Sequence, residues 1–259
     1  MKARLQGVAV VQIDASSRTD TGKVRQQNED SCGSFVPSDP DEREKKGVLY
    51  IVADGMGGHR GGEVASRLAV ATIRAHYYSN QAITPAAALA EAFQEANRLI
   101  YERSQSDETL IGMGTTCTAM LIIGQEAFFA HVGDSRAYLS REGALRQITE
   151  DHSLVGEMLR AGLITREDAR THPQRNVITK SLGVQKSVQA DHPSTPFVIE
   201  SGDVFLLCSD GLTALVSDDD IKSALGAADS NSACSQLIDL ANQKGGLDNI
   251  TVQVIRIEK

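Results

Sequence analysis

The chain has 259 residues, with 26 Lys and Arg against 34 Asp and Glu, so its formal net charge is −8 at neutral pH. Hydrophobic residues make up 41% and charged residues 23% of the sequence, which is typical of a globular protein and excludes disorder throughout the chain. Nucleic acids and anionic membranes both select a basic surface. We therefore expect neither nucleic acid nor membrane among the partners of this acidic chain.

The sequence also bears on where the protein is located. The longest apolar run, Val48–Ala53, is much shorter than the roughly 20 residues that a membrane-spanning helix requires. The apolar stretch from Val8 to Val11 is too short for the core of a signal peptide. The 4 cysteines lie far apart and form no C-x-x-C pair, which favours reduced thiols over a disulfide framework or a zinc site. These observations predict a cytoplasmic protein.

Two strands joined by a long loop are expected near the start of the chain. The segment Pro37–Gly47 contains prolines and charges of both signs, and it lies between the apolar runs Cys32–Val36 and Val48–Ala53. A polar segment between two apolar runs is typical of a hairpin. We therefore expect Pro37–Gly47 to form a loop between two strands.

Two helices are predicted to follow this hairpin. The first extends from about Gly62 to Tyr78, and the second begins at Thr84, a favourable N-cap before Pro85, and ends near Ser104. Apolar residues at helical spacing are expected to face the core, namely Val64, Leu68, Ala71 and Ala75 in the first helix and Leu89, Phe93, Ala96 and Ile100 in the second.

The rest of the chain alternates between strands and helices. Thr115–Ile123, Glu126–Val132 and Arg136–Leu139 are rich in strand-forming residues and separated by short turns, which predicts an antiparallel meander. Glu150–His172 is expected to form two short helices on either side of Gly162. Strands are then predicted at Pro196–Ile199, Val204–Cys208 and Ile250–Ile257, and helices at Asp218–Leu225 and Ser232–Lys244. This order fits antiparallel sheets with helices packed outside them.

Several familiar catalytic motifs are absent from the sequence. The Gly22-Lys23 pair is followed by Val24, so there is no P-loop, and neither H-E-x-x-H nor G-x-S-x-G occurs. No cysteine has an arginine six residues further along the chain. A phosphatase with a cysteine nucleophile in C-x5-R spacing is therefore excluded.

Acidic residues occur instead at the ends of the predicted strands. Asp54-Gly55 follows one buried strand and Asp210-Gly211 follows another, and further acids lie at Glu29, Asp30, Asp134 and Asp248. A single Asp-Gly pair is a common turn signal. Several carboxylates that meet at one sheet end would repel one another unless a cation neutralised them, and oxygen ligands suit Mg²⁺ or Mn²⁺ better than Zn²⁺. The residues alone leave a divalent-metal site and a set of structural turns as alternatives.

Six motifs in the same order give the chain a specific resemblance. They are Arg25-Gln26-Gln27-Asn28-Glu29-Asp30, Val52-Ala53-Asp54-Gly55-Met56-Gly57-Gly58-His59, Gly114-Thr115-Thr116, His131-Val132-Gly133-Asp134-Ser135-Arg136, Cys208-Ser209-Asp210-Gly211-Leu212 and Asp248-Asn249-Ile250-Thr251. With them the chain resembles the metal-dependent serine/threonine protein phosphatases of type 2C, in their compact bacterial form. The resemblance implies an α+β fold, a four-layer α/β/β/α sandwich in which two central antiparallel sheets are flanked by helix pairs. It also implies a single domain over residues 8–258, with residues 150–181 forming a flap beside the metal cleft.

The resemblance implies metal ligands residue by residue. Asp54 would bridge two cations, Mn²⁺ or Mg²⁺, and the carbonyl of Gly55 would bind the second. Asp210 and Asp248 would complete the first site, and Glu29 would serve the second directly or through water. Asp134 would hold a third, weaker cation, together with the backbone carbonyl of Asn176, whereas the alternative for Asp134 is a turn-capping side chain.

The remaining implied roles concern substrate and proton transfer. Arg25 would hold the substrate phosphate, Asp30 would orient a metal-bound water, and Asn249 would brace the Asp248 loop. Two cations would lower the pKa of a bridging water so that hydroxide attacks phosphorus in line. Some eukaryotic members carry a His directly after the Asp-Gly pair, where this chain has Met56. His59 is a candidate proton donor in its place, as are metal-bound waters, and the alternative for His59 is local packing or hydrogen bonding.

The expected function is therefore hydrolysis of phosphoserine and phosphothreonine in proteins, by a monomer that opposes a serine/threonine protein kinase. One alternative is a catalytically inactive regulator that binds a phosphoprotein, but all the motif carboxylates are present. Another is a metal-dependent phosphodiesterase or nuclease, which the net charge of −8 disfavours. The flap helices could likewise be ordinary surface helices.

Overall fold

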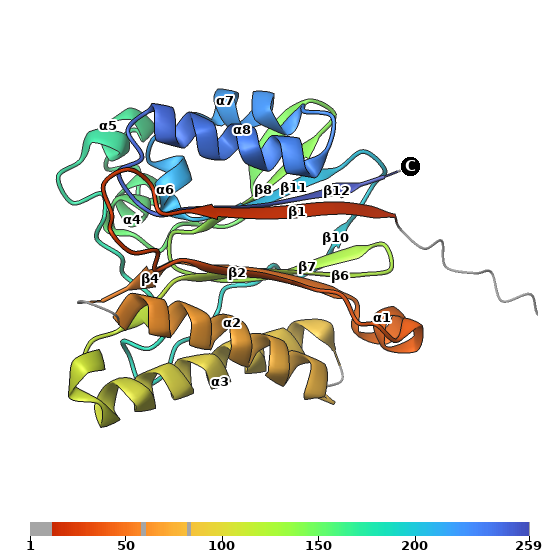
Figure 1. The fold of residues 1–259 in the computed structure, drawn as a ribbon, viewed down its shortest axis with the longest axis horizontal. Coiled ribbons are helices and arrows are strands. Elements are labelled where there is room, and N and C mark those ends of the chain that lie inside the picture. Colours follow the sequence, from red (N-terminus) through yellow and green to blue (C-terminus); the bar gives the residue numbers. More distant parts are fainter. Residues whose placement is uncertain (1–11, 58–60, 82–83, 259) are drawn as a thin grey trace, which may run out of the picture.

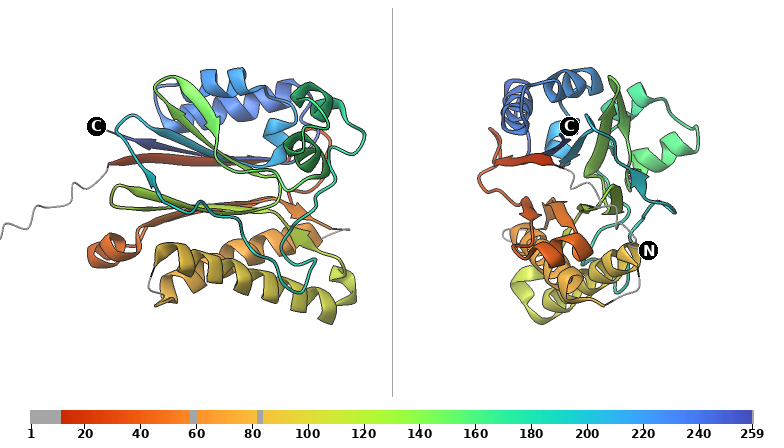
Figure 2. Two further views of the ribbon diagram at one scale, coloured as in Figure 1. Left: turned by 180° about the vertical axis from the view of Figure 1, so that it is seen from behind. Right: turned by 90° about the vertical axis from the view of Figure 1, so that its right-hand side faces the viewer.

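The computed structural model describes residues 12–57, 61–81 and 84–258. Two five-stranded sheets pack face to face, and helices cover the outer face of each (Figure 1; Figure 2 shows the same layers from two other sides). Sheet A contains, in spatial order, β1 (Ile13–Asp20), β12 (Ile250–Ile257), β11 (Val204–Cys208), β8 (Arg136–Arg141) and β9 (Ala144–Gln147). Sheet B contains β10 (Phe197–Val198), β7 (Glu126–Val132), β6 (Cys117–Ile123), β3 (Val48–Ala53) and β2 (Ser31–Phe35). All the strand pairs are antiparallel.

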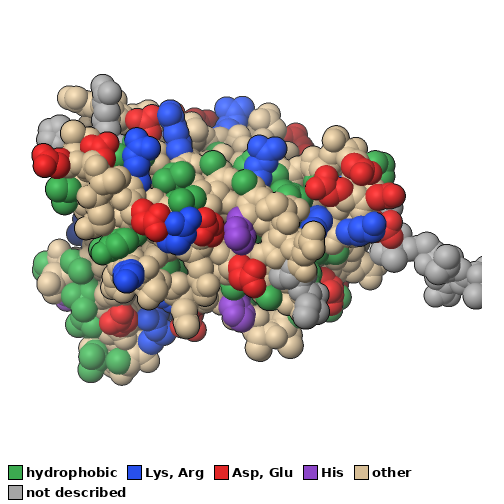
Figure 3. Space-filling model, turned by 90° about the horizontal axis from the view of Figure 1, so that it is seen from below, with side chains coloured by type: hydrophobic (Ala, Val, Ile, Leu, Met, Phe, Trp, Pro, Cys, Tyr) green, Lys and Arg blue, Asp and Glu red, His purple; other side chains and the backbone are tan. Residues whose placement is uncertain are grey.

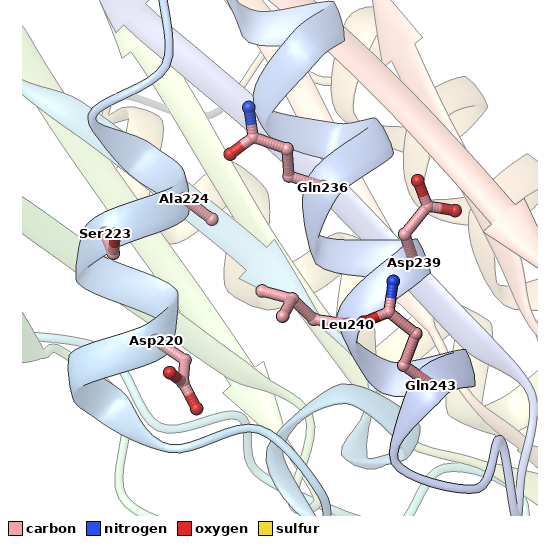
Figure 4. Close-up of a pocket in the computed structure, with 7 residues that line it drawn as sticks. All are labelled: Asp220, Ser223, Ala224, Gln236, Asp239, Leu240 and Gln243. Carbon is pink, nitrogen blue, oxygen red and sulfur yellow. The ribbon is translucent and has the colours of Figure 1, made fainter.

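Helices complete the outer layers on both sides. The pair α2 (Gly61–Ser79) and α3 (Pro85–Ser106) covers sheet B, and the pair α7 (Asp218–Leu225) and α8 (Ser230–Gln243) covers sheet A. Between α7 and α8 lies a shallow groove, across which Ala224 and Leu240 point toward each other (Figure 4). The α+β, α/β/β/α sandwich expected from the resemblance is therefore confirmed.

Shorter elements connect these layers. They are α1 (Pro40–Lys46), β4 (Gly55–Met56) paired with β5 (Gly114–Thr115), the 3₁₀ turn η1 (Glu108–Leu110), α4 (Leu154–Arg160), α5 (Arg166–Thr171) and α6 (Asp210–Thr213). The segment Pro37–Gly47, predicted to be loop, thus contains a helix. Asp39 caps α1 by accepting a hydrogen bond from the amide of Asp41, and Pro40 begins it. Although no residue of α1 is buried, this cap and the acidic first turn favour the helix.

The core lies in three layers that follow from the strand patterns. β3 is buried along its whole length, because sheet B is covered on both faces. Large side chains fill the space between the sheets, among them Tyr50, Met120, Phe129 and Phe205. Two further clusters join sheet B to α2 and α3 and sheet A to α7 and α8. The two sheets therefore share one hydrophobic layer, and this layer fixes the relative position of their strand ends.

The two long helices differ in how well their buried faces were predicted. In α3 the Thr84 side chain accepts a hydrogen bond from the amide of Ala87, and all four residues of the expected stripe are buried. In α2 the second half of the expected stripe is wrong, since Ala71 and Ala75 are exposed, whereas Val64 and Leu68 are partly buried and pack against the core. The fully buried face lies one or two positions further along, at Ala65, Ala69, Ile73 and Tyr77. In an alanine-rich helix the apolar and polar faces differ little, so the sequence predicts the buried face poorly. In the structure the buried face of α2 is the one that contacts α3 and sheet B.

The predicted meander is wrong at its third strand. β6 and β7 do pair in sheet B, but β8 belongs to sheet A, where it pairs with β11 and with the unpredicted strand β9. The chain crosses between the sheets at Gly133, which has a φ of 114°. A Cβ there would lie 2.4 Å from the Cβ of Thr116, so only glycine fits this turn. The crossing places Asp134 at the end shared by both sheets.

The surface shows no strong bias on the side of α2 and α3. Acidic and basic side chains are interspersed over that face (Figure 3). Within the described ranges, no helix combines the length and the apolar character needed to cross a membrane.

Candidate metal centre

The acidic residues singled out from the sequence lie at element ends of both sheets. Asp54 follows β3, Asp210 is the first residue of α6 directly after β11, and Asp248 precedes β12. Glu29 and Asp30 precede β2, and Asp134 lies in the turn between β7 and β8. The structure brings these groups close enough that the charges of Asp30, Asp134, Asp210 and Asp248 all act on Asp54. His59 lies outside the described residues.

The electrostatics of the centre follow from burial and crowding. Burial, followed by the repulsion of the neighbouring carboxylates, raises the pKa of Asp54 well above its ordinary value. The pKa of Asp210 is raised by burial and by Asp248, while a hydrogen bond from Asp54 lowers it. Burial, and then the charge of Asp210, raises the pKa of Asp134. Without a cation these carboxylates destabilise one another.

The buried oxygens test whether the centre fits a divalent cation. Three carboxylate oxygens among the described residues are buried without a hydrogen-bond donor: Glu29 Oε1, Asp30 Oδ1 and Asp134 Oδ1. Buried polar atoms normally have partners, because an unpaired one costs free energy. A cation would satisfy such oxygens, and this all-oxygen set suits Mg²⁺ or Mn²⁺. The residues present therefore fit the cations that the resemblance implies.

Arg25 is paired with one of the predicted ligands. Its guanidinium donates to Oδ2 of Asp248 at 2.8 Å, and Oδ1 of Asp248 accepts from the amide of Asn249 at 2.9 Å. Both oxygens of Asp248 are thus turned toward protein donors. In the described part of the chain, no group of three or more Asp, Glu, His or Cys side chains has the arrangement of a complete metal site. A cation at Asp248 would compete with Arg25 for the same oxygen.

Asp30 lies behind the other carboxylates and is held by the neighbouring strand. Its Oδ2 accepts from the hydroxyl of Ser209 at 2.8 Å, and that hydroxyl accepts from the amide of Thr251 at 2.9 Å. Burial raises the pKa of Asp30 to about 7. Near neutral pH this side chain can therefore hold or release a proton.

Asn249 braces two loops of the centre, as expected. Its Oδ1 accepts from the amide of Glu29 at 2.8 Å, and its Nδ2 donates to the carbonyls of Thr21 and Gln27 at 3.0 and 2.9 Å. The loop that carries Arg25 and Glu29 is thereby fixed to the loop that carries Asp248. Residues far apart in the sequence are held at one place by this amide.

Glycines allow three segments to meet beside Asp54. A Cβ on Gly55 would lie 2.1 Å from the carbonyl oxygen of Gly62 and 2.5 Å from that of Glu29. The amide of Gly62, in the first turn of α2, donates to the carboxylate of Glu29. Sequence reasoning gave Gly62 no role, although the Gly61-Gly62 pair at the predicted helix start signals a close approach.

A second set of residues that sequence reasoning missed holds the backbone of Asp54 through hydrogen bonds. The hydroxyl of Thr116 accepts from the amide of Asp54 at 3.1 Å and is hydrogen-bonded to the hydroxyl of Ser135 at 2.7 Å. Thr116 lies between β5 and β6, and its hydroxyl thus connects Asp54, after β3, to Ser135 in the crossing between β7 and β8. The motifs containing Thr116 and Ser135 were recognised, but a hydroxyl alone does not indicate which backbone group it will bind.

A cleft of about 470 Å³ opens beside the carboxylates. Asp134 and Asp210 line one part of it, and Asn176 and the helices α4 and α5 line another. The two helices agree with the prediction for Glu150–His172, and Gly162 lies between them with a φ of 69°.

Comparison with known proteins identifies the family to which this site belongs. The sequence profile of the family Protein phosphatase 2C matches residues 23–243. The chain belongs to the protein phosphatase 2C family. The serine/threonine phosphatase stp of Listeria welshimeri is 42% identical over 248 residues, which cover 94% of this chain and 95% of that protein. Protein phosphatase PhpP of Streptococcus pneumoniae is 38% identical over 95% of this chain and 98% of its own length.

Solved structures of serine/threonine phosphatases have the same fold. The serine/threonine phosphatase PstP/Ppp of Mycobacterium tuberculosis superposes with a TM-score of 0.85 at 38% identity, covering 96% of this chain and 100% of that one. The catalytic domain of PstP in complex with two manganese ions gives a TM-score of 0.84 at 35% identity, with 96% and 100% covered.

Proposed function

We propose that this protein phosphatase of the 2C family removes phosphate from phosphoserine and phosphothreonine at the carboxylate centre. The observation that carries the proposal is the convergence of buried, unpaired carboxylate oxygens from the ends of both sheets. Asp54, the carbonyl of Gly55, Glu29, Asp210 and Asp248 would hold two cations, and Asp134 would hold a third. The two manganese ions in the PstP complex support Mn²⁺, and the oxygen donors also suit Mg²⁺.

When bound, such cations act as Lewis acids that activate water for attack on phosphorus, consistent with the metal-bridging hydroxide that the resemblance implies. Arg25 would bind the phosphate, because its side chain is 52% exposed and a guanidinium matches two phosphate oxygens. Asp30 would orient the attacking water through Oδ1 and take up its proton, since its pKa lies near neutral. His59 would protonate the leaving oxygen.

Further parts of the proposal concern the whole protein. We propose one domain over residues 8–258, with residues 150–181 as a flap, which α4 and α5 support by lining the cleft. The substrates would be proteins phosphorylated by a serine/threonine kinase, and the enzyme would act as a monomer in the cytoplasm.

A phosphate-release assay tests the function. A phosphothreonine peptide is incubated with the protein in Mn²⁺, in Mg²⁺ and in excess chelator, with Asp54→Asn as the matched inactive variant. We expect release only with the cations and the unchanged protein. Tight binding of the phosphopeptide without turnover in any condition would instead identify a catalytically inactive binding protein.

A further inference from the structure

The lining of the cleft beside the carboxylate centre combines two kinds of charged group. Asp134 and Asp210 of the centre line it, and so do three arginines of the flap residues, Arg166, Arg170 and Arg175. The arginines come from α5, which packs against α4, and from the loop that follows α5 (Figure 1). A molecule that enters the cleft therefore meets the proposed reaction centre and this arginine cluster together.

The cluster is held by the local structure of α5. Thr165 and Asp168 form a capping box, in which each side chain bonds the backbone amide of the other residue, and this fixes the start of the helix. Arg166 and Arg170 are four residues apart and share one face of the helix. Arg175 follows in a turn closed by the bond from its amide to the carbonyl of His172 at 3.1 Å. Three cations are thus kept on the same cleft wall.

Other arginines in the cleft are already neutralised. Arg136 is paired with Asp151 at 2.7 Å, and Arg160 lies 3.6 Å from Glu150. By contrast, none of the described carboxylates forms an ion pair with the three arginines of the cluster, which are all exposed. Asp218, the first residue of α7, is the remaining carboxylate of the lining outside the carboxylate centre. The three unpaired arginines therefore give the flap part of the lining an excess of positive charge on an acidic protein.

We propose that Arg166, Arg170 and Arg175 form an anion subsite for a second negatively charged side chain of the phosphoprotein substrate. This inference rests on the proposed function, because it assumes that the scissile phosphate lies at the carboxylate centre. Guanidinium groups bind carboxylates and phosphates through paired hydrogen bonds, and clusters of them recognise acidic and phosphorylated motifs. Substrates with an acidic or phosphorylated residue near the scissile phosphoresidue are thereby favoured over neutral ones.

Sets of three peptides that differ at one position test the subsite. Every peptide carries the same phosphothreonine, and within a set one nearby residue is Gln, Glu or phosphoserine; one set is made for each position from one to five residues away. We expect the unchanged protein to favour the Glu and phosphoserine peptides over the Gln peptide by about tenfold in kcat/KM at the best position, because each exposed charge pair contributes a few-fold at most. The Glu and phosphoserine arms show whether a carboxylate suffices or a phosphate is needed.

Variants assign the preference to the cluster. Arg166→Gln, Arg170→Gln and Arg175→Gln combined should bring the ratio of kcat/KM between charged and neutral peptides close to one. A control with Arg43→Gln, Lys45→Gln and Arg103→Gln removes the same number of charges from α1 and α3, and it should keep the ratio. Replacement of the three flap arginines by Glu should reverse the preference toward a Lys-containing peptide. An unchanged ratio in both flap variants, or an equal loss in the control, overturns the proposal.

Binding separates this inference from the proposed function. In the Asp54→Asn background the affinity for the same peptides is measured without turnover, by fluorescence anisotropy at low and high salt. Tighter, salt-sensitive binding of the charged peptides that disappears in the flap variant supports the subsite even if no peptide is hydrolysed. Equal binding of charged and neutral peptides contradicts it even if the enzyme is active.

Discussion

Asp54 shows at the scale of one residue how the centre is built. Its carboxylate is surrounded by acids from four other segments, and its amide is held by Thr116. The positions of these acids could be predicted from the sequence, because Asp-Gly pairs after buried strands are visible there. The pairing of Arg25 with Asp248 could not, since it depends on side-chain torsions that no spacing encodes.

The first prediction concerns the central carboxylates. Asp54→Asn or Asp210→Asn should lower kcat by at least about 100-fold, because loss of a cation forfeits several kcal/mol of transition-state stabilisation. The measurement is phosphate release at saturating peptide across a range of Mn²⁺ concentrations. Turnover that stays unchanged in excess chelator would contradict both the metal requirement and these assignments.

A second prediction separates the role of Arg25 from that of its partner. Arg25→Ala should raise KM for the phosphopeptide, because a guanidinium binds phosphate and cannot ligate a cation. Since Arg25 occupies Oδ2 of Asp248, its removal should leave the apparent affinity for Mn²⁺ unchanged or tighter. Steady-state kinetics and calorimetric titration measure the two quantities. Weaker Mn²⁺ binding with an unchanged KM would show that Arg25 supports the metal ligands instead.

The third prediction concerns Asp134, whose Oδ1 is buried without a partner. Asp134→Ala should leave the two cations at Asp54, Asp210 and Asp248 in place, because a single carboxylate supplies few ligands to a third. Turnover should fall, and the weaker phase of metal activation should disappear. A crystal soaked in Mn²⁺ gives the direct check. Turnover equal to that of the unchanged protein, without density for a cation at this carboxylate, would leave Asp134 as a turn cap.

At the scale of the elements, most strands and helices were predictable, and their partners were less so. β7, β11, α7 and β12 have the predicted bounds, because each has a clear period and a turn signal at its ends. β1 was not predicted, since its residues are polar and half of the strand is exposed. The position of β8 in sheet A was also not predicted. The sequence of a short turn does not distinguish two strands that pair with each other from two strands that enter different sheets.

A fourth prediction tests how α3 supports the segment that follows the flap residues in the chain. The buried Asn97 accepts from the amide of Gly183 at 2.8 Å and donates to the carbonyl of Gln185 at 3.1 Å. Asn97→Leu leaves the Gly183 amide unpaired and should lower the free energy of unfolding by about 1–3 kcal/mol. Urea unfolding measures this. Gln94→Leu, at an exposed position of the same helix, is the control, and an equal loss there would refute the role of the hydrogen bonds.

At the scale of the whole molecule, the crowded acids couple stability to pH and metal. Burial raises the folded-state pKa of Asp30 to about 7 and those of Asp54 and Asp134 above their ordinary values. The folded protein therefore binds protons that the unfolded chain has released, so its stability without metal falls as pH rises from about 4 toward 7. Burial lowers the folded-state pKa of His131 to about 4, and this has the opposite effect on stability. As pH falls below about 6.5, the unfolded chain binds a proton at this residue and the folded protein does not, so the free energy of unfolding decreases.

The fifth prediction uses the difference with and without metal, in which the effect of His131 cancels. The rise in melting temperature caused by Mn²⁺ should be larger at about pH 8 than at about pH 5.5, because the cation replaces the protons of the raised carboxylates. Differential scanning calorimetry of both forms measures it. Asp54→Asn should shrink the rise at the higher pH, and a rise that is independent of pH in the unchanged protein would refute the coupling.

The pairing of β1 with β12 has a consequence for the way the protein is made. β1 is an edge strand of sheet A, and its partner throughout Ile13–Asp20 is β12, from Ile257 back to Ile250. During translation β1 leaves the ribosome early and stays without that partner until β12 emerges, whereas β2, β3, β6 and β7 can already pair. Asp248 and Asn249 immediately precede β12, so the loop with Arg25 and Glu29 also lacks its partners until this part of the chain emerges. A nascent chain therefore lacks the carboxylate centre until β12 has been synthesised.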